Sequence, residues 1–374
     1  METRPLPKDR FSLFVILVSL TIIEMAISSL LLNHFSRMEG WSATFAEDSE
    51  GYLLVTRYFL GENIPDAFNT LVHYRLFSPL IPFVVSFLGK VLPLPSAFFL
   101  LNSLLWIATA YLFYLFAQGL LQSNSRALAC SIIFTTSLPL MVWGLPIMVD
   151  MGAYFFVALI LLLDQQCKKF NGAIIIGLVT ALAILTKPTL VAILLFLIVY
   201  HGMKKEIGKT LVIAGISVTA VIIVYSCLSL ELKDFFAYSS PRHQGIFYVL
   251  NSFFFCFHFG LILALWGWKE LKEIRNFSLL FLLTTLSLYL PFVHNPRLLF
   301  IIYPAIIPLI SVGADTISQG LANRYNWDKR FLFRLIISTL VVISNILTAF
   351  YLYVTRTLEL RSIENLLKFL RILS

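Results

Sequence analysis

The residues best suited to chemistry lie in one polar stretch near the start of the chain, residues 33–75, and above all in its segment 47–52 (EDSEGY). A carboxylate in such a stretch can accept a proton from an attacking hydroxyl or amine. We predict that Asp48 is a general base. The charged residues of the stretch are six acids and three arginines, namely Glu39, Glu47, Asp48, Glu50, Glu62, Asp66, Arg37, Arg57 and Arg75.

Further polar residues stand at the ends of apolar segments. We expect one face of the protein to gather Asp48, Arg75, Asp150, Lys187, Arg242, His243, His294 and Arg297. Acids and cations around an apolar cavity suit the transfer of a sugar from a lipid-linked phosphate. The carboxylate would take the acceptor proton, and the cations would stabilise the departing phosphate. Inverting transfer needs one base on the sugar face opposite the leaving group.

The composition predicts the elements that must position these residues. The chain has 374 residues, of which 59% are hydrophobic and 13% charged, whereas soluble domains are about 25% charged. Apolar runs of the length that a bilayer requires, about 17–25 residues, recur from end to end. The runs are continuous rather than alternating, which favours helices over a barrel. We predict an all-α polytopic membrane protein, with segment 11–32 as a true span rather than a cleaved signal peptide.

Hydropathy predicts about eleven transmembrane helices. The stretch 76–92 is apolar but rich in proline, and we expect it to dip into the outer leaflet without crossing. Lys187-Pro188 should separate two spans. The predicted spans are 12–32, 97–120, 127–143, 150–163, 171–186, 188–200, 210–230, 246–268, 277–293, 298–313 and 331–354.

The distribution of basic residues predicts the orientation. With 76–92 not crossing, most lysines and arginines fall in loops on one side, the pattern of cytoplasmic loops. The N-terminus is then cytoplasmic and Asp48 is on the outer face. We attribute the net charge of +8 to these basic loops, which determine the orientation in the membrane. We therefore expect no nucleic-acid partner. We expect no disulfide framework or zinc site from the four cysteines, which lack paired spacing.

Local patterns add detail to this plan. Residues 49–60 should form an interfacial helix, with Tyr52, Val55 and Phe59 on one face and Gly61 at its end. Glu24, inside the first span, should face the bundle interior. The sequence divides into a membrane domain, 1–357, with an outer catalytic loop at 33–96, and an amphipathic helix, 358–374, lying on the membrane.

Four stretches resemble the GT-C class of integral-membrane glycosyltransferases, in particular the polyprenyl-phosphate-sugar-dependent branch related to protein O-mannosyltransferases and aminoarabinose transferases. They are Asp48-x-x-x-Tyr52, residues 74–82 (YRLFSPLIP), residues 146–150 (PIMVD) and residues 185–189 (LTKPT). Asn295-Pro296-Arg297 and Tyr303-Pro304 support the match. Unlike the family members with appended soluble domains, this sequence is expected to have no large soluble domain after the spans.

The resemblance implies a role for each matching position. Asp48 is the general base, and Asp150 helps to hold the acceptor or a metal. Arg75, Lys187, Arg297 and Tyr52 bind the donor phosphate or sugar. The implied enzyme is a multi-pass protein of the plasma (inner) membrane that transfers a hexosyl or pentosyl group in cell-envelope glycosylation, with a polyprenyl-phosphate-linked sugar as donor and a lipid, glycan or protein as acceptor. No cofactor is certain, although Mg²⁺ or Mn²⁺ could bind to the acidic pair.

Each assignment has a plainer alternative. Asp48 and Asp150 could be helix N-caps, Glu47 or Glu50 could be the base, and Lys187 could reach the membrane surface as a snorkelling lysine. Arg297 could be a turn residue or could contact a lipid headgroup. His73 and His294 are too scattered for a metal site, and His258 is expected to make a structural hydrogen bond. For the whole chain, the alternative functions are a membrane transporter or lipid flippase, and an inert assembly partner.

Overall fold

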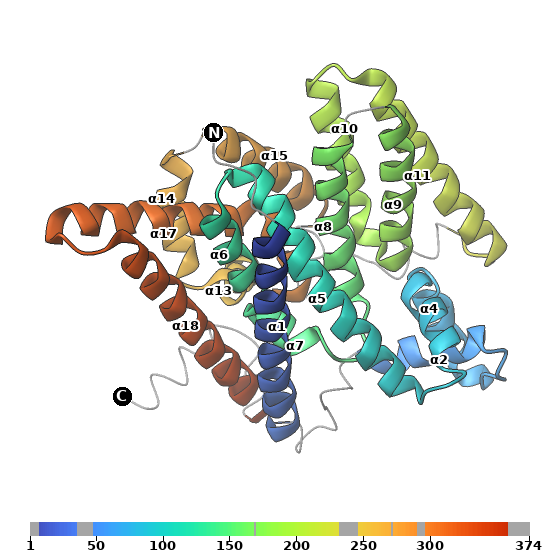
Figure 1. Ribbon diagram of the computed structural model, residues 1–374. Helices are drawn as coiled ribbons and strands as arrows, with labels where there is room; N and C mark the ends of the chain where they lie inside the picture. Colours follow the sequence, from blue (N-terminus) through green and yellow to red (C-terminus); the bar gives the residue numbers. More distant parts are fainter. Residues whose placement is uncertain are drawn as a thin grey trace.

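The computed structural model describes residues 7–35, 48–167, 170–231, 246–270, 272–289 and 296–357, and within these every regular element is a helix (Figure 1). The α-helices are α1 Pro7–Phe35, α2 Ser49–Phe59, α3 Asn69–Arg75, α4 Leu80–Leu88, α5 Leu94–Leu121, α6 Asn124–Thr135, α7 Leu138–Trp143, α8 Asp150–Gln166, α9 Phe170–Thr186, α10 Val191–Met203, α11 Ile207–Cys227, α13 Ile246–Phe257, α14 Gly260–Glu270, α15 Lys272–Tyr289, α16 Pro296–Leu299, α17 Tyr303–Tyr325 and α18 Lys329–Thr357. Single 3₁₀ turns are η2 Asp66–Phe68, η3 Pro188–Leu190 and η5 Phe300–Ile302.

Several of these helices can cross a membrane. Among the described residues, five segments are long and apolar enough, and two further pairs of helices qualify only as bent units. Helices α9 and α10 are apolar but shorter. The chain is therefore an integral membrane protein, while the number of eleven spans stays a prediction. The five segments are Phe11–His34, Leu94–Leu121, Ile207–Cys227, Pro296–Tyr325 and Lys329–Tyr353.

The predicted break at Lys187-Pro188 is confirmed, because α9 ends at Thr186 and a 3₁₀ turn begins at Pro188. The predicted single span 127–143 is wrong in detail. It consists of α6 and α7, separated at Thr136 and Ser137. Both hydroxyls donate to backbone carbonyls of the preceding turn, a local bond that competes with helix continuation.

The predicted span 246–268 is also divided. Its two parts, α13 and α14, meet at an angle of 86°, and His258 at the bend has a left-handed φ of 35°. His258 is 7% exposed, and its Nδ1 has no hydrogen-bond partner in the described part of the chain. Nδ1 therefore does not make the expected structural hydrogen bond, which stays a prediction for His258 as a whole.

The stretch 76–92 contains one short helix, α4, whose nine residues extend about 13 Å. A bilayer core is about 30 Å thick, so α4 alone cannot cross it. Its axis is turned 115° from the segment Asp66–Arg75 that precedes it. Such a bent pair can form either a broken span or a re-entrant loop, so the expectation that 76–92 does not cross stays a prediction.

The first polar loop folds as predicted in the part that is described. Helix α2 covers Ser49–Phe59, and Gly61, with a φ of 77°, follows its end. Tyr52 and Val55 are buried, and the Phe59 ring contacts Phe83 of α4 at 5.4 Å between centroids. Figure 1 shows α2 and α4 together beside the lower end of α9. The amphipathic tail 358–374 lies outside the described residues.

A cluster of aromatic rings fills the centre of the bundle. The Tyr303 ring contacts Phe113 and Phe134 at 4.9 and 4.7 Å, and Tyr154 contacts Phe300 at 5.3 Å. These rings join α5, α6, α8, η5 and α17. Glu24 of α1 is 3% exposed, which confirms that it faces the bundle interior.

Candidate active site

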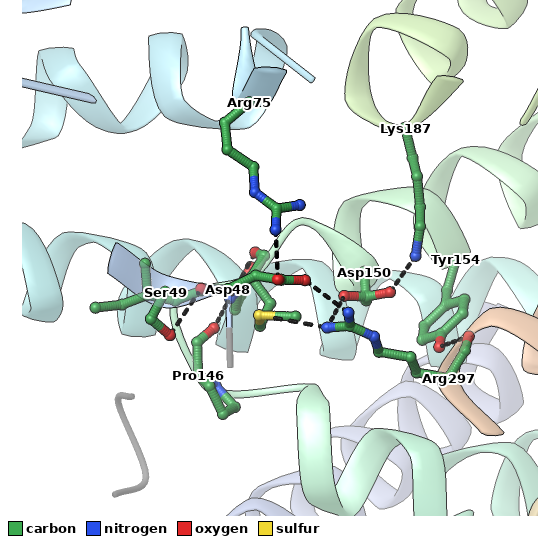
Figure 2. Close-up of polar contacts among 11 residues, drawn as sticks. Asp48, Ser49, Arg75, Pro146, Asp150, Tyr154, Lys187 and Arg297 are labelled. Atoms are coloured by element: carbon green, nitrogen blue, oxygen red, sulfur yellow. Dashed lines mark hydrogen bonds and ion pairs between the residues drawn. The ribbon is translucent and has the colours of Figure 1, made fainter. Parts of the chain in front are cut away.

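Asp48 lies immediately before α2, and its carboxylate contacts two arginines from distant parts of the chain (Figure 2). Arg75 Nη2 donates to Asp48 Oδ1 at 2.5 Å, and Arg297 Nη2 donates to Asp48 Oδ2 at 2.6 Å. Asp48 occupies the N-cap position of α2, but its side chain makes no capping hydrogen bond. The cap position alone therefore does not explain how this carboxylate is held.

Asp150 is the first residue of α8, and the N-cap is Val149, so the N-cap alternative for Asp150 is wrong. Its side chain is almost fully buried and accepts a hydrogen bond from Lys187 Nζ at Oδ1. Arg297 Nη1 lies 3.8 Å from the other oxygen, Oδ2. Lys187 stands between α9 and η3, so its ammonium pairs with Asp150 instead of reaching toward a membrane surface.

Arg297 connects the two acids, because one guanidinium nitrogen contacts Asp48 and the other faces Asp150 (Figure 2). Its side chain is 8% exposed, and Nη1 also lies 3.7 Å from Met148 Sδ. The backbone carbonyl of Arg297 accepts a hydrogen bond from the Tyr154 hydroxyl at 2.8 Å. Arg297 is thus a buried member of the cluster rather than an exposed turn residue.

Arg75 reaches the cluster from the end of α3 and packs on α2. Its guanidinium lies over the Tyr52 ring, 5.3 Å from the centroid, within the range of a cation–π contact. Gly51 allows this approach, since a Cβ atom there would lie only 2.8 Å from Arg75 Cγ. Tyr52 therefore belongs to the cluster through Arg75.

Charge and burial act in opposite directions on these groups. Burial would raise the pKa of Asp48, but Arg297 and Arg75 together hold that pKa below its ordinary value. Burial lowers the pKa of Lys187, and the neighbouring Asp150 opposes this effect. The pair Lys187–Asp150 and the three-residue group Arg75–Asp48–Arg297 keep oppositely charged groups in direct contact in a largely buried place.

The structure thus brings together six of the residues that the sequence predicts as site residues, namely Asp48, Tyr52, Arg75, Asp150, Lys187 and Arg297. Glu50, the alternative base, is exposed on α2. His73 contacts the rings of Tyr74 and Phe77. Residues Glu47, Arg242, His243 and His294 lie outside the described part of the chain.

Two supporting residues were missed by the sequence analysis. Tyr154 holds the Arg297 backbone, and its own carbonyl accepts a hydrogen bond from Tyr303 at 3.0 Å. The sequence did indicate Tyr154, because it follows Asp150 by four residues and so lies on the same helix face. Met148, which contacts Arg297, gave no comparable signal.

A second charged cluster lies at the opposite end of α8. His201 is 1% exposed and lies between Asp164 and Glu206, with 2.8 and 2.7 Å from its ring nitrogens to their oxygens. Lys209 Nζ donates to Asp164 at 2.9 Å. Asp164 is 14 residues beyond Asp150 on one helix, about 21 Å away. This cluster joins α8, α10 and α11 and is separate from the candidate site.

The residues around Asp48 and Asp150 do not fit a divalent cation. Mg²⁺ and Mn²⁺ prefer several oxygen ligands around one point, but both carboxylates already contact Arg75, Lys187 or Arg297. Within the described ranges, no group of three or more His, Cys, Asp and Glu side chains could hold a metal ion.

No protein-family model matches the chain, and no curated protein sequence matches it. Its fold is nevertheless similar to that of solved membrane transferases. One is the archaeal oligosaccharyltransferase AglB from Archaeoglobus fulgidus in complex with an inhibitory peptide and a dolichol-phosphate, with a TM-score of 0.54 and 14% identity, covering 89% of this chain and 55% of that chain.

Two further structures of the Archaeoglobus fulgidus oligosaccharyltransferase agree. The apo form has a TM-score of 0.53 at 14% identity and covers 90% of this chain and 56% of that one. The complex with Zn and sulfate has a TM-score of 0.52 at 14% identity, with 88% and 53% covered. This chain spans about half the length of these proteins. The resemblance to the GT-C class is thus confirmed for the fold.

Proposed function

We propose that this chain is a glycosyltransferase that moves a sugar from a polyprenyl-phosphate donor to an acceptor on the non-cytoplasmic face of the membrane, with inversion and with Asp48 as general base. One observation carries the proposal. Asp48 contacts guanidinium groups from two remote segments, in a fold similar to that of membrane oligosaccharyltransferases.

The cations suit a donor whose leaving group is a phosphate. Arginine side chains bind phosphate oxygens with two parallel hydrogen bonds, and buried cations stabilise the charge that develops as the sugar–phosphate bond breaks. Arg75, Lys187 and Arg297 would serve this purpose, with Tyr52 supporting Arg75. Phe83 and Phe87 of α4 are 44% and 55% exposed, so the apolar donor tail would lie against a lipid-facing surface beside the site.

Asp48 suits the role of a base that works only when the donor is present. Its lowered pKa keeps the carboxylate ionised at neutral pH, but two guanidinium partners also weaken its attraction for a proton. A donor phosphate would compete for Arg75 and Arg297 and so increase the proton affinity of Asp48. The carboxylate would then accept the proton of the attacking group.

Asp150 would orient the acceptor, because its carboxylate is fixed by Lys187 beside the proposed base. A peptide is bound in one of the structural neighbours, which supports a protein acceptor among the candidates lipid, glycan and protein. We assign the site to the outer face of the plasma (inner) membrane. A topology reporter fused after Leu94, at the start of α5, should therefore read as non-cytoplasmic.

The reaction can be tested with the purified full chain in lipid nanodiscs. The protein is given polyprenyl-phosphate-linked hexoses and pentoses and a panel of lipid, glycan and peptide acceptors, and transferred sugar is followed by mass spectrometry. We expect transfer, and NMR of the product should show inversion at the anomeric carbon. Retention would contradict the assigned mechanism. Flux of donor across proteoliposomes without transfer would instead establish the alternative of a transporter or flippase.

A further inference from the structure

The two acids of the candidate site are connected by an arginine instead of standing apart. Arg297 Nη2 lies 2.6 Å from Asp48 Oδ2, and Arg297 Nη1 lies 3.8 Å from Asp150 Oδ2 (Figure 2). The two nitrogens belong to one planar group, so both contacts share a single rigid cation. A guanidinium stays protonated at any physiological pH, so a positive charge stands between the acids throughout that range.

The arginine is also fixed at its backbone. Its carbonyl accepts the Tyr154 hydroxyl at 2.8 Å, and Tyr154 itself is 1% exposed. Arg297 is the second residue of the segment Pro296–Tyr325. In the apolar 18-residue window of this segment, 94% is buried. Residues on such a segment have little freedom to move away, because displacement would open a cavity in a packed core. The guanidinium is thus positioned by the fold itself.

We propose that the Arg297 guanidinium takes the place between Asp48 and Asp150 that a divalent cation would need, so that the site works without a metal ion. The transfer part of this inference rests on the proposed function, but the exclusion of the metal does not. A divalent ion bound by both carboxylates would have to lie close to a buried positive charge. Like charges in a partly desolvated place repel strongly, and the arginine already makes the contacts that the ion would make.

Without a metal ion, cationic side chains must neutralise the leaving phosphate in the proposed reaction. In a metal-dependent site the ion would contact the leaving group. Here the cations Arg75, Lys187 and Arg297 would neutralise the charge of the leaving phosphate. The acceptor side would then depend on Asp150, whose oxygens are directed by Lys187 and Arg297.

Binding of Mn²⁺ tests the inference without donor or acceptor. Purified chain in detergent is titrated with Mn²⁺, and free Mn²⁺ is measured by electron paramagnetic resonance. The variants are Arg297→Gln, which removes the charge but keeps hydrogen-bonding groups, Asp48→Asn, and the double variant of both. Arg126→Gln is the matched control, because Arg126 pairs with Asp315 and that acid also contacts Lys329, in a separate cluster.

We expect wild type and Arg126→Gln to show no Mn²⁺ site that depends on Asp48. Arg297→Gln should bind Mn²⁺ at least tenfold more tightly than wild type, and the added Asp48→Asn change should abolish this gain. A stoichiometric wild-type site that is lost in Asp48→Asn would overturn the inference, and so would an Arg297→Gln variant that binds no better than wild type. The wild-type measurement decides the question even if Arg297→Gln fails to fold.

Transfer assays separate this inference from the proposed function. With the chelator EDTA present, we expect wild-type transfer within twofold of the rate in Mg²⁺ or Mn²⁺. A rate that EDTA abolishes and Mn²⁺ restores would overturn the metal-free site while supporting the transferase. Absence of transfer under every condition, with the expected Mn²⁺ result, would remove the proposed function and leave the arginine bridge.

Discussion

Arg297 Nη2 lies 2.6 Å from Asp48 Oδ2, although the two residues are 249 positions apart in the sequence. The contact joins the first polar loop to the start of the most buried apolar segment. It also places the proposed base beside a cation that cannot lose its proton. We propose that this carboxylate, held between two guanidinium groups, takes the proton of the acceptor.

The pH dependence of transfer should report the charge partners of Asp48. Arg75 helps to hold the Asp48 pKa below its ordinary value. Protonated Asp48 cannot act as a base, so kcat/KM should fall as the pH drops through its pKa. Arg75→Gln should raise this pKa, and the acidic limb of the kcat/KM profile should therefore move to higher pH. An acidic limb that stays in place or moves to lower pH would contradict the assignment, and Arg126→Gln should leave it unchanged.

The Tyr52 ring should matter for its π surface rather than its hydroxyl. The ring lies under the Arg75 guanidinium, and a cation–π contact contributes roughly 0.5–2 kcal/mol. Tyr52→Leu should raise the KM for the donor by about 2- to 30-fold, whereas Tyr52→Phe should stay close to wild type. Equal KM values for the two variants would show that the ring does not support Arg75.

Donor binding should be sensitive to the addition of a single methyl group at Gly51. A Cβ atom there would meet Arg75 Cγ at 2.8 Å and Nε at 3.2 Å, so Gly51→Ala should displace Arg75 and weaken donor binding. Alanine is a better helix former than glycine, so thermal unfolding in detergent should show little loss. The matched control is Gly320→Ala, where nothing lies within 4 Å of the added atom. If both variants keep the wild-type donor KM, the packing argument is wrong.

The sequence was sufficient to find the charged residues but not their pairing. Asp150, Lys187 and Arg297 stand at the ends of apolar segments, and alternating spans place such ends on one face. Nothing in the sequence fixes which cation meets which acid, since that depends on tilts and on side-chain reach. The partition of the Arg297 guanidinium between Asp48 and Asp150 is a tertiary property of this kind.

We predicted one helix break from the sequence, at Lys187-Pro188, and missed those at Thr136–Ser137 and His258. Pro188 predicts the helix break before it, because proline lacks a backbone N–H donor and restricts the backbone conformation of the preceding residue. The break at Thr136–Ser137 also has a proline signal, because Pro139 lies in the first turn of α7, but hydropathy runs across it. The break at His258 depends on a left-handed residue that hydropathy does not detect.

The most direct measurement is single-turnover sugar transfer by Asp48→Asn. Asp315→Asn is the matched control, because Asp315 also contacts two cations, Arg126 and Lys329, and its side chain is 14% exposed against 18% for Asp48. Loss of a general base should lower the rate by about 10²- to 10⁴-fold, while donor binding persists and Asp315→Asn retains the wild-type rate. Transfer by Asp48→Asn at the wild-type rate would contradict the account, because Asp48 would then not be the base.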